Sequence, residues 1–307
     1  MNERQIVCED LGLALDGLRS EGFRIEVIYP ADEPHTAVLS RDGCSVRVTT
    51  RADAPTPSTA LPAFEPAFVF TPAGDSGGEG RAGMLYRDLI PNRLGGRYIA
   101  SHITIAAGGP VSDWVHFHRI TLQLIFVSKG WVRLVYEDQG DPFVARAGDL
   151  VLQPPTIRHQ VLESSSGLEV VEVACPALHE TFADHDMQLP NRPTDFERDF
   201  EGQRFLHHIA AKALWTPYQG GEAQETGLLR AADGLVDARV LRGSLTKSVS
   251  DGSELVFGFV LQGSAQLDYR TGYSLRPADA FVIPPDEPWG FSRASDDFLL
   301  LSVTTAK

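Results

Sequence analysis

The stretch HFHRITLQLIFVSKG, residues 116–130, decides the fold of this 307-residue chain. It begins with His116 and His118, which are separated by one residue, and continues into an apolar run. Successive side chains of a strand point to opposite faces, so the two imidazoles share one face. Two imidazoles on one face of a strand supply half of a donor set for a transition metal. The stretch therefore predicts a β structure that carries a metal site.

A second histidine-bearing stretch, RAGDLVLQPPTIRH, covers residues 146–159 and ends in His159. Together with Gln123, the three histidines fall within 44 residues. A single strand histidine is usually an ordinary polar residue, but three at these spacings favour metal binding. Neutral imidazoles suit Fe²⁺, Zn²⁺, Ni²⁺, Cu²⁺ and, less commonly, Mn²⁺.

The same barrel-like pattern occurs twice along the chain. Short segments rich in Val, Ile, Leu and aromatic residues recur, separated by Gly and Asp-Gly turns, which is typical of a sandwich or barrel. GWVRLVYED (130–138) matches GSAQLDYRT (263–271), and RAGDLVLQPPTIRH matches RPADAFVIPPDEPW (276–289). The chain is therefore predicted to hold two copies of one barrel unit.

These motifs resemble those of the cupin superfamily. The first cupin motif is a glycine, His-x-His, four residues, an acid, six residues and a glycine; the second runs from a glycine through a proline to a histidine. The matching residues here are Gly109, His116, His118, Gln123 and Gly130, then Gly148, Pro154 and His159. The resemblance implies a mainly β chain of two tandem cupin (double-stranded β-helix, or jelly-roll) barrels, a bicupin. A helical pattern over 9–21 followed by three short strand segments adds a small α+β N-terminal extension.

The resemblance also implies which residues hold the metal. His116, His118, Gln123 and His159 take the ligand positions for one divalent transition metal per chain, with Fe²⁺ favoured and Zn²⁺, Ni²⁺ or Mn²⁺ as alternatives. Gln123 stands where the family has a glutamate, so it is either a neutral oxygen ligand or a hydrogen-bonding neighbour. A neutral ligand leaves the full charge of the ion and makes it a stronger Lewis acid.

In the second copy, the ligand positions fall near Val249, Asp251, Val256 and Trp289. None of them is a histidine, so the second barrel is predicted to be degenerate and without metal.

Two further groups near the first motif are candidates for chemistry. His102, in the strand ASHITIA, is predicted to line the first-barrel pocket if its face of the strand is inward, where it would handle protons or add a nitrogen ligand. Glu169 and Glu172 lie on opposite faces of one predicted strand, so at most one of them points inward. An inward carboxylate near a cation is a candidate base.

The resemblance makes a metal-dependent enzyme acting on a small oxygenated or aromatic substrate the leading hypothesis, with a dioxygenase-like reaction at a three-histidine ferrous centre. The alternatives are a non-oxidative lyase, isomerase or cyclase, and a binding protein without turnover.

Composition shifts divide the chain into five predicted regions. They are an α+β extension (1–50), a linker rich in Pro, Ala and Thr (51–66), a metal-binding barrel (67–176), a helical connector (177–213) and a degenerate barrel (214–307). His207 and His208 fall in the predicted connector helix, where adjacent residues do not share a face.

The charge balance limits the partners that we expect. With 27 basic and 41 acidic residues, the net charge is −14, which argues against nucleic acid and anionic membranes. The three cysteines are widely spaced, and no apolar run resembles a signal core or a membrane span. We expect a soluble, cytoplasmic homodimer whose partner is a small-molecule substrate.

Overall fold

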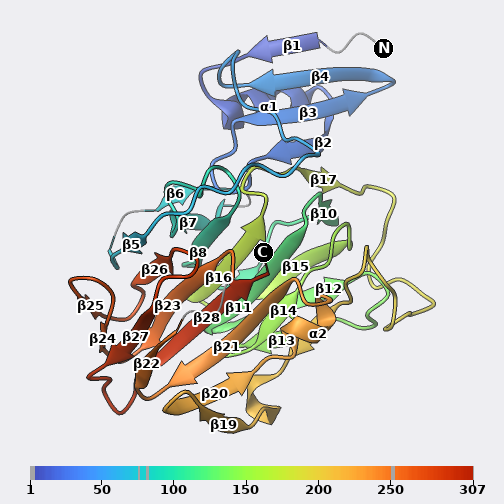
Figure 1. Ribbon diagram of the computed structural model, residues 1–307. Helices are drawn as coiled ribbons and strands as arrows, with labels where there is room; N and C mark the ends of the chain where they lie inside the picture. The colour runs from blue at the N-terminus through green and yellow to red at the C-terminus, as the bar shows by residue number, and fades with distance from the viewer. Residues whose placement is uncertain (1–3, 75–76, 81–82, 250–252, 307) are drawn as a thin grey trace.

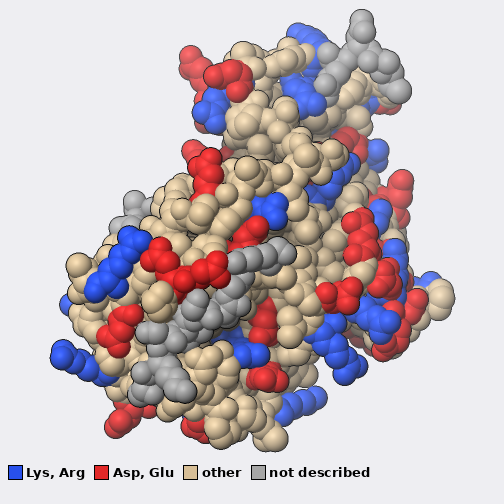
Figure 2. All heavy atoms as spheres, in the orientation of Figure 1, with Lys and Arg blue, Asp and Glu red and all other residues tan. Residues whose placement is uncertain are grey.

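The computed structural model describes residues 4–74, 77–80, 83–249 and 253–306. The fold is mainly β: two tandem barrels lie side by side, and a small N-terminal module stands on one end of the first barrel (Figure 1). In the described part of the chain, no helix has the length and apolar character needed to cross a membrane. On the face shown in Figure 2, the described acidic and basic side chains are interspersed.

The N-terminal module is an α+β unit in which a helix packs on a four-stranded sheet. Its elements are β1 (Arg4–Val7), α1 (Leu11–Ser20), β2 (Arg24–Tyr29), β3 (Thr36–Arg41) and β4 (Cys44–Thr49). The helix begins where the Asp10 side chain accepts a hydrogen bond from Leu13 N, and it ends before Gly22, which has a φ of +91°. Asp42 and Gly43 both have positive φ, which suits a two-residue hairpin turn between β3 and β4.

The first barrel is built from two sheets. Its strands are β6 (Gly78–Glu79), β7 (Leu85–Asp88), β8 (Ile99–Ile105), β9 (Gly109–Pro110), β10 (His116–His118), β11 (Leu122–Lys129), β12 (Trp131–Tyr136), β13 (Phe143–Arg146), β14 (Leu150–Leu152), β15 (His159–Ser164), β16 (Leu168–Cys175), β17 (Thr181–Ala183) and β18 (Leu206–His208). One sheet has the order β18-β14-β11-β16-β8-β7-β6. The other runs from the module into the barrel as β1-β4-β3-β2-β17-β10-β15-β12-β13, with β9 beside β15.

The second barrel repeats this plan. Its elements are β5 (Val69–Thr71), β19 (Trp215–Tyr218), β20 (Gly221–Glu225), α2 (Leu228–Ala231), β21 (Val236–Arg242), β22 (Leu245–Val249), β23 (Val256–Gln262), β24 (Ala265–Leu267), β25 (Tyr273–Leu275), β26 (Ala280–Ile283), β27 (Trp289–Ser292) and β28 (Leu299–Thr305). They form sheets of order β19-β20-β21-β28-β23-β26-β5 and β22-β27-β24-β25.

Matching turns show the internal repeat directly. In the first barrel, Asp149 accepts hydrogen bonds from the backbone N–H groups of Arg146 and Ala210. In the second, Asp279 accepts them from Arg276 and Ala73. Each aspartate therefore closes a tight turn and also binds a backbone N–H of a segment that is distant in the sequence. The aspartate has the same structural role in both barrels.

Two strands do not pair where the predicted regions place them. β5 lies within 67–176 but pairs with β26 of the second barrel, and β18 lies within 177–213 but pairs with β14 of the first. The barrels also share one apolar core, to which Leu124 and Val173 of the first barrel and Phe257 and Leu301 of the second contribute. The two barrels are therefore interlocked.

The prediction of a helical connector over 177–213 is wrong. The segment contains β17, β18 and one 3₁₀ turn, η2 (Ala210–Lys212), and β17 and β18 pair with β10 and β14. The unpaired edges of the first barrel offer backbone hydrogen bonds that outweigh the helical pattern of the sequence. His207 and His208 therefore lie on a strand, where His207 stacks on Phe143 with 4.3 Å between ring centroids.

Candidate metal centre

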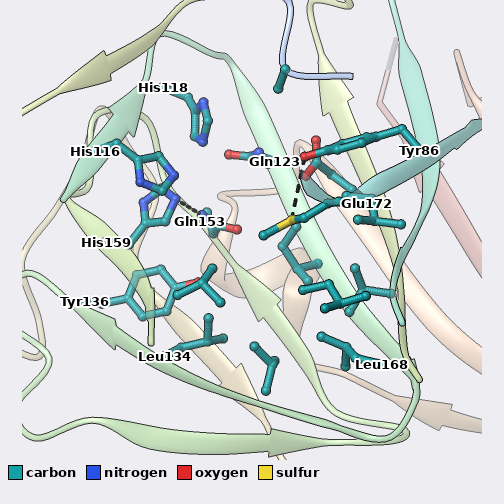
Figure 3. Close-up of a pocket in the computed structure, with 18 residues that line it drawn as sticks. Tyr86, His116, His118, Gln123, Leu134, Tyr136, Gln153, His159, Leu168 and Glu172 are labelled. Carbon is teal, nitrogen blue, oxygen red and sulfur yellow. Dashed lines mark hydrogen bonds between the residues drawn. The ribbon is translucent and has the colours of Figure 1, made fainter. Parts of the chain in front are cut away.

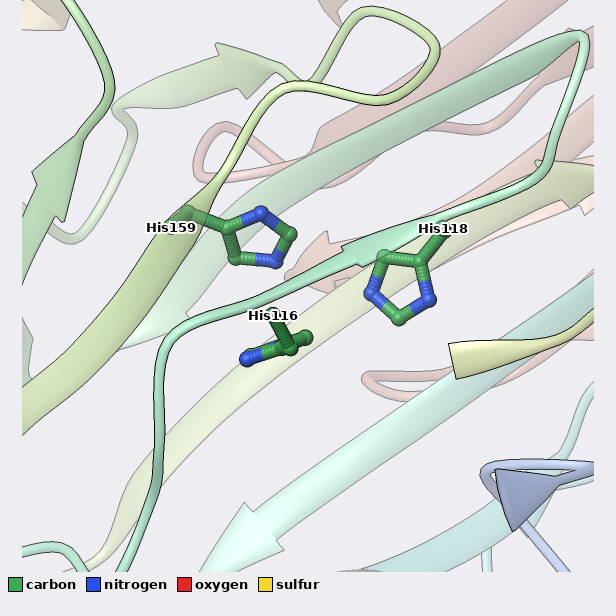
Figure 4. A group of neighbouring side chains, drawn as sticks. All are labelled: His116, His118 and His159. Atoms are coloured by element: carbon green, nitrogen blue, oxygen red, sulfur yellow. The ribbon is translucent and has the colours of Figure 1, made fainter. Parts of the chain in front are cut away.

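Three imidazoles meet inside the first barrel. β10 carries His116 and His118 on one face, as alternation predicts, and β15 brings His159 directly opposite His116 in the strand register. One nitrogen from each ring lies within 4.8 Å of the others, and all three residues are buried (Figure 4). The strand pairing thus assembles residues that are far apart in the sequence into one donor set.

Hydrogen bonds on the outer side of each ring set the direction of its free nitrogen. Nδ1 of His116 lies 2.8 Å from the carbonyl oxygen of Trp114, and Nδ1 of His159 lies 3.0 Å from that of Ile157. A carbonyl only accepts, so both Nδ1 atoms donate and both Nε2 atoms keep a lone pair. Nδ1 of His118 lies 3.1 Å from the hydroxyl of Thr181, and this hydrogen bond orients the ring.

A buried carboxylate stands behind the first histidine. Asp113 Oδ1 lies 3.6 Å from His116 Nδ1, and its Oδ2 accepts a hydrogen bond from Val161 N. A carboxylate behind a ligating imidazole orients the ring and increases its basicity. The sequence prediction did not include Asp113, although an acid three residues before His116 is a local signal that points to it.

Gln123 presents an unsatisfied oxygen to the same cavity. The residue is 2% exposed, and its Oε1 is buried without a hydrogen-bond partner among the described residues. A buried amide oxygen that makes no hydrogen bond is costly, and a cation would remove that cost. The donor set of three imidazole nitrogens and one amide oxygen therefore fits a divalent transition metal.

Gln153 is a fifth polar residue at the site, which the sequence prediction missed. Its Nε2 lies 2.7 Å from Nε2 of His159 and donates to the lone pair that a metal would use. Metal binding at His159 therefore requires the Gln153 amide to turn, which would direct its oxygen into the cavity. The signal for this residue is its position directly before the Pro-Pro of the second motif.

The cavity around these groups is small and mainly apolar. Its volume is about 80 Å³, enough for an ion with a few waters or one small ligand. Most of its wall is aliphatic, contributed by Met84, Ile103, Ile105, Ile125, Val132, Leu134, Val161, Leu168 and Val170. Such a wall excludes water and strengthens electrostatic interactions inside the cavity.

One carboxylate faces the histidines from the far wall. Glu172 on β16 lines the cavity, and Figure 3 shows it across from His116 and His159. Burial, together with the charges of Glu172 and Asp113, raises the pKa of the Tyr136 hydroxyl, so this cavity residue stays protonated. Glu169 lies outside the cavity, as expected for residues on opposite faces of one strand.

The prediction that His102 lines the pocket is wrong. On β8 the cavity-facing residues are Ile103 and Ile105, so alternation turns His102 outward. Its Nε2 lies 3.0 Å from Glu169, and its ring centroid lies 5.3 Å from that of Phe259 in the second barrel. Burial and the nearby Arg87 guanidinium lower the pKa of His102. His102 is therefore a contact between the barrels and has no access to the metal centre.

The positions matching the ligands in the second barrel carry no donor set among the described residues. Val249 pairs with Trp289 in the register that joins His116 to His159 in the first barrel. Trp289 is buried against Phe281 and Phe291. Asp251 lies outside the described residues.

Comparison with known proteins supports the fold. No protein-family model and no curated protein sequence matches the chain. Among solved structures, it is similar to a single-residue variant of oxalate decarboxylase from Bacillus subtilis (TM-score 0.53, 10% identity, 84% of this chain and 80% of that chain). It is also similar to oxalate decarboxylase from Lactobacillus farciminis in its formate complex (0.53, 15%, 83% and 88%). A putative glyoxylate-induced protein from Pseudomonas aeruginosa is similar as well (0.55, 12%, 83% and 95%).

These similarities span both barrels, and the chain has a bicupin fold. Within that fold, the first barrel holds the three-histidine group that suits a divalent metal ion.

Proposed function

We propose that this chain is a metal-dependent enzyme that carries out non-oxidative chemistry, of the lyase or isomerase type, on a small substrate bearing a carboxylate or a carbonyl group. The observation that carries the proposal is the convergence of His116, His118 and His159 in a mainly apolar cavity that is also lined by Glu172. A bound divalent ion would supply Lewis-acid activation of the substrate oxygen.

The residues of the cavity divide the remaining work. Gln123 adds no charge, so a site with this amide and three imidazoles attracts anionic oxygens more strongly than one with a glutamate. The imidazoles and amides that line the cavity are neutral, whereas Glu172 carries a carboxylate. Glu172 is therefore the group that would take or give a proton, through its carboxylate oxygens. The aliphatic wall excludes water, which protects a carbanion-like transition state from side reactions.

Cavity size narrows the substrate class. A volume of about 80 Å³ suits a two- to four-carbon acid better than a bulky aromatic compound. Two of the similar structures are oxalate decarboxylases, which act on a small dicarboxylate. We therefore propose small dicarboxylates and 2-oxo acids as the first substrates to test.

An O₂-dependent dioxygenase with Fe²⁺ is the second candidate, because an apolar cavity of this kind would also hold O₂ beside the three histidines. The two candidates differ in a measurable way: the dioxygenase consumes O₂ in proportion to product, whereas the lyase does not. Oxygen-electrode and CO₂ measurements on oxalate, glyoxylate and acetoacetate separate them.

Elemental analysis of the purified chain and of His159→Ala tests the metal site itself. We expect about one divalent metal per chain in the wild type and less than about 0.1 in the variant, because losing one of three imidazoles removes the facing strand's only nitrogen ligand. His207→Ala, which removes a histidine outside the cavity, is the matched control and should keep the metal. Full metal content in His159→Ala would refute the site.

A further inference from the structure

The N-terminal module is joined to the metal centre by one continuous sheet. Ile28 on β2 pairs with Thr181 on β17, and Thr181 pairs with His118 on β10. The chain that leaves β2 therefore emerges beside β17 and close to β10, the strand that carries His116 and His118 (Figure 1). The module is thus more than an appendage to the barrel.

The loop after β2 forms part of the cavity wall. Ala31 lines the cavity together with His116 and His118, although it belongs to the module. The blue N-terminal ribbon passes beside the cavity in Figure 3. Since the other lining residues come from the first barrel, Ala31 is the module's contribution to this wall.

This loop is anchored at its middle and at its start. Asp32 Oδ2 lies 2.8 Å from Nη2 of Arg93, and Arg93 also lies 2.8 Å from Asp88. The Asp32 side chain is only 10% exposed, so this ion pair is less screened by solvent than a surface pair. On the other side, Tyr29 is buried and its hydroxyl accepts a hydrogen bond from Arg47. The loop is therefore held in place over the barrel.

The contacts around the loop leave little free space. A Cβ atom added to Gly80 would lie 2.5 Å from the ring of Tyr86 and 2.8 Å from the carbonyl oxygen of Ala31. Tyr86 also lines the cavity. Outside the loop, a groove of about 800 Å³ is lined by residues of α1 and β2 and by Pro34 and Gly80. The loop thus lies between a wide outer groove and the small metal cavity.

We propose that the N-terminal module forms the entrance wall of the metal cavity, and that the side chain of Ala31 sets the size of the molecule that reaches the three histidines. Because Ala31 is small, it admits small aliphatic acids, whereas a larger side chain would project into a space of about 80 Å³. We call this control of access by Ala31 the gate. The gate does not depend on the function proposed above, but the identity of the admitted molecule as the substrate does.

Chemical labelling of the metal-free, full-length chain tests the gate without metal or substrate. Diethyl pyrocarbonate modifies accessible imidazoles, and peptide mass spectrometry gives the rate at each histidine. We expect Ala31→Phe to slow labelling of His116, His118 and His159 at least about tenfold, and Ala31→Gly to accelerate it. Labelling of His207 gives the internal reference, and Leu13→Phe on the exposed face of α1 is the matched control.

Ala31→Val covers the case in which the phenylalanine variant fails to fold. The proposal predicts the order Gly, Ala, Val for decreasing rates at the three histidines. Equal rates across these folded variants would overturn it.

Ligand size is then tested on Co²⁺-loaded protein, with acetate and butyrate as probes and visible absorption as the signal. We expect Ala31→Phe to bind about one Co²⁺ per chain but to lose at least about tenfold in butyrate affinity, with a smaller loss for acetate. An unchanged butyrate affinity would contradict the size role. A wild-type chain that binds no Co²⁺ would refute the proposed function, while the labelling result would still decide the gate.

Discussion

At one register position, the two barrels carry residues of different types: His116 pairs with His159 in the first, and Val249 with Trp289 in the second. The backbone pairing is the same in both. The difference continues into the neighbouring strands, where Gln153 N donates to the carbonyl of Gln123 in the first barrel. The matching pair in the second barrel is Val256 and Ile283.

The strand pair that carries Glu172 differs between the barrels in the same way. Glu172 pairs with Ile125 in the first barrel, and the corresponding pair in the second is Ser302 and Gly258. At Gly258, an added Cβ would lie 2.3 Å from the ring of Phe281, so an aromatic side chain fills the space there. One barrel therefore keeps a cavity into which a few polar groups point, and the other has a packed core at the matching positions. The comparison teaches that this fold supports a site only where polar lining groups are retained.

The largest expected effect is on stability. Trp289→Ala removes a side chain that is 4% exposed and packed on two aromatic rings, so we expect the free energy of unfolding to fall by ~3–5 kcal/mol. Urea unfolding of the metal-free protein measures this change. Metal content per folded chain should remain that of the wild type, and a loss of metal would mean that the division of labour between the barrels is wrong.

A smaller effect is expected from a change of charge at the centre. Gln123→Glu adds a negative charge beside the three imidazoles, so affinity for the metal should rise by about tenfold (~1.4 kcal/mol), while acetate binding to the Co²⁺ form should weaken. Competition with a chelator measures the first change and visible absorption the second. Gln123→Met is the control: if it leaves metal affinity unchanged, Gln123 is not a ligand.

The smallest effect concerns the contact between the barrels. Burial and Arg87 lower the pKa of His102, so the folded state keeps it neutral while the unfolded chain takes up a proton below about pH 6.5. Its contribution to stability is therefore complete above that pH and is lost as the pH falls toward the lowered pKa of the folded state. His102→Gln should reduce the pH dependence between pH 7 and 5 by less than ~1.4 kcal/mol per pH unit, as measured by urea midpoints. If the free energy of unfolding changed with pH equally in the wild type and in His102→Gln, His102 would not contribute to the pH dependence of stability.

Much of the architecture follows from local sequence patterns. The repeat of Gly-bounded strand segments predicted two barrels, and the spacing of His116, His118 and His159 predicted the residues that converge. These features are readable because strand alternation and turn chemistry act over a few residues. The sequence also placed Glu169 and Glu172 on opposite faces, without showing which face was inward.

Tertiary structure decided what alternation alone leaves open. The orientation of β8 in its sheet places His102 against Phe259 of the second barrel. Residues 181–183 and 206–208 form strands instead of a helix because they pair with β10 and β14. Gln153 and Ala31 joined the site because distant segments meet there. The sequence by itself determined which residues are available for chemistry. Only the packing of sheets against each other, through hydrogen bonds and burial between remote segments, determined which of them share a cavity.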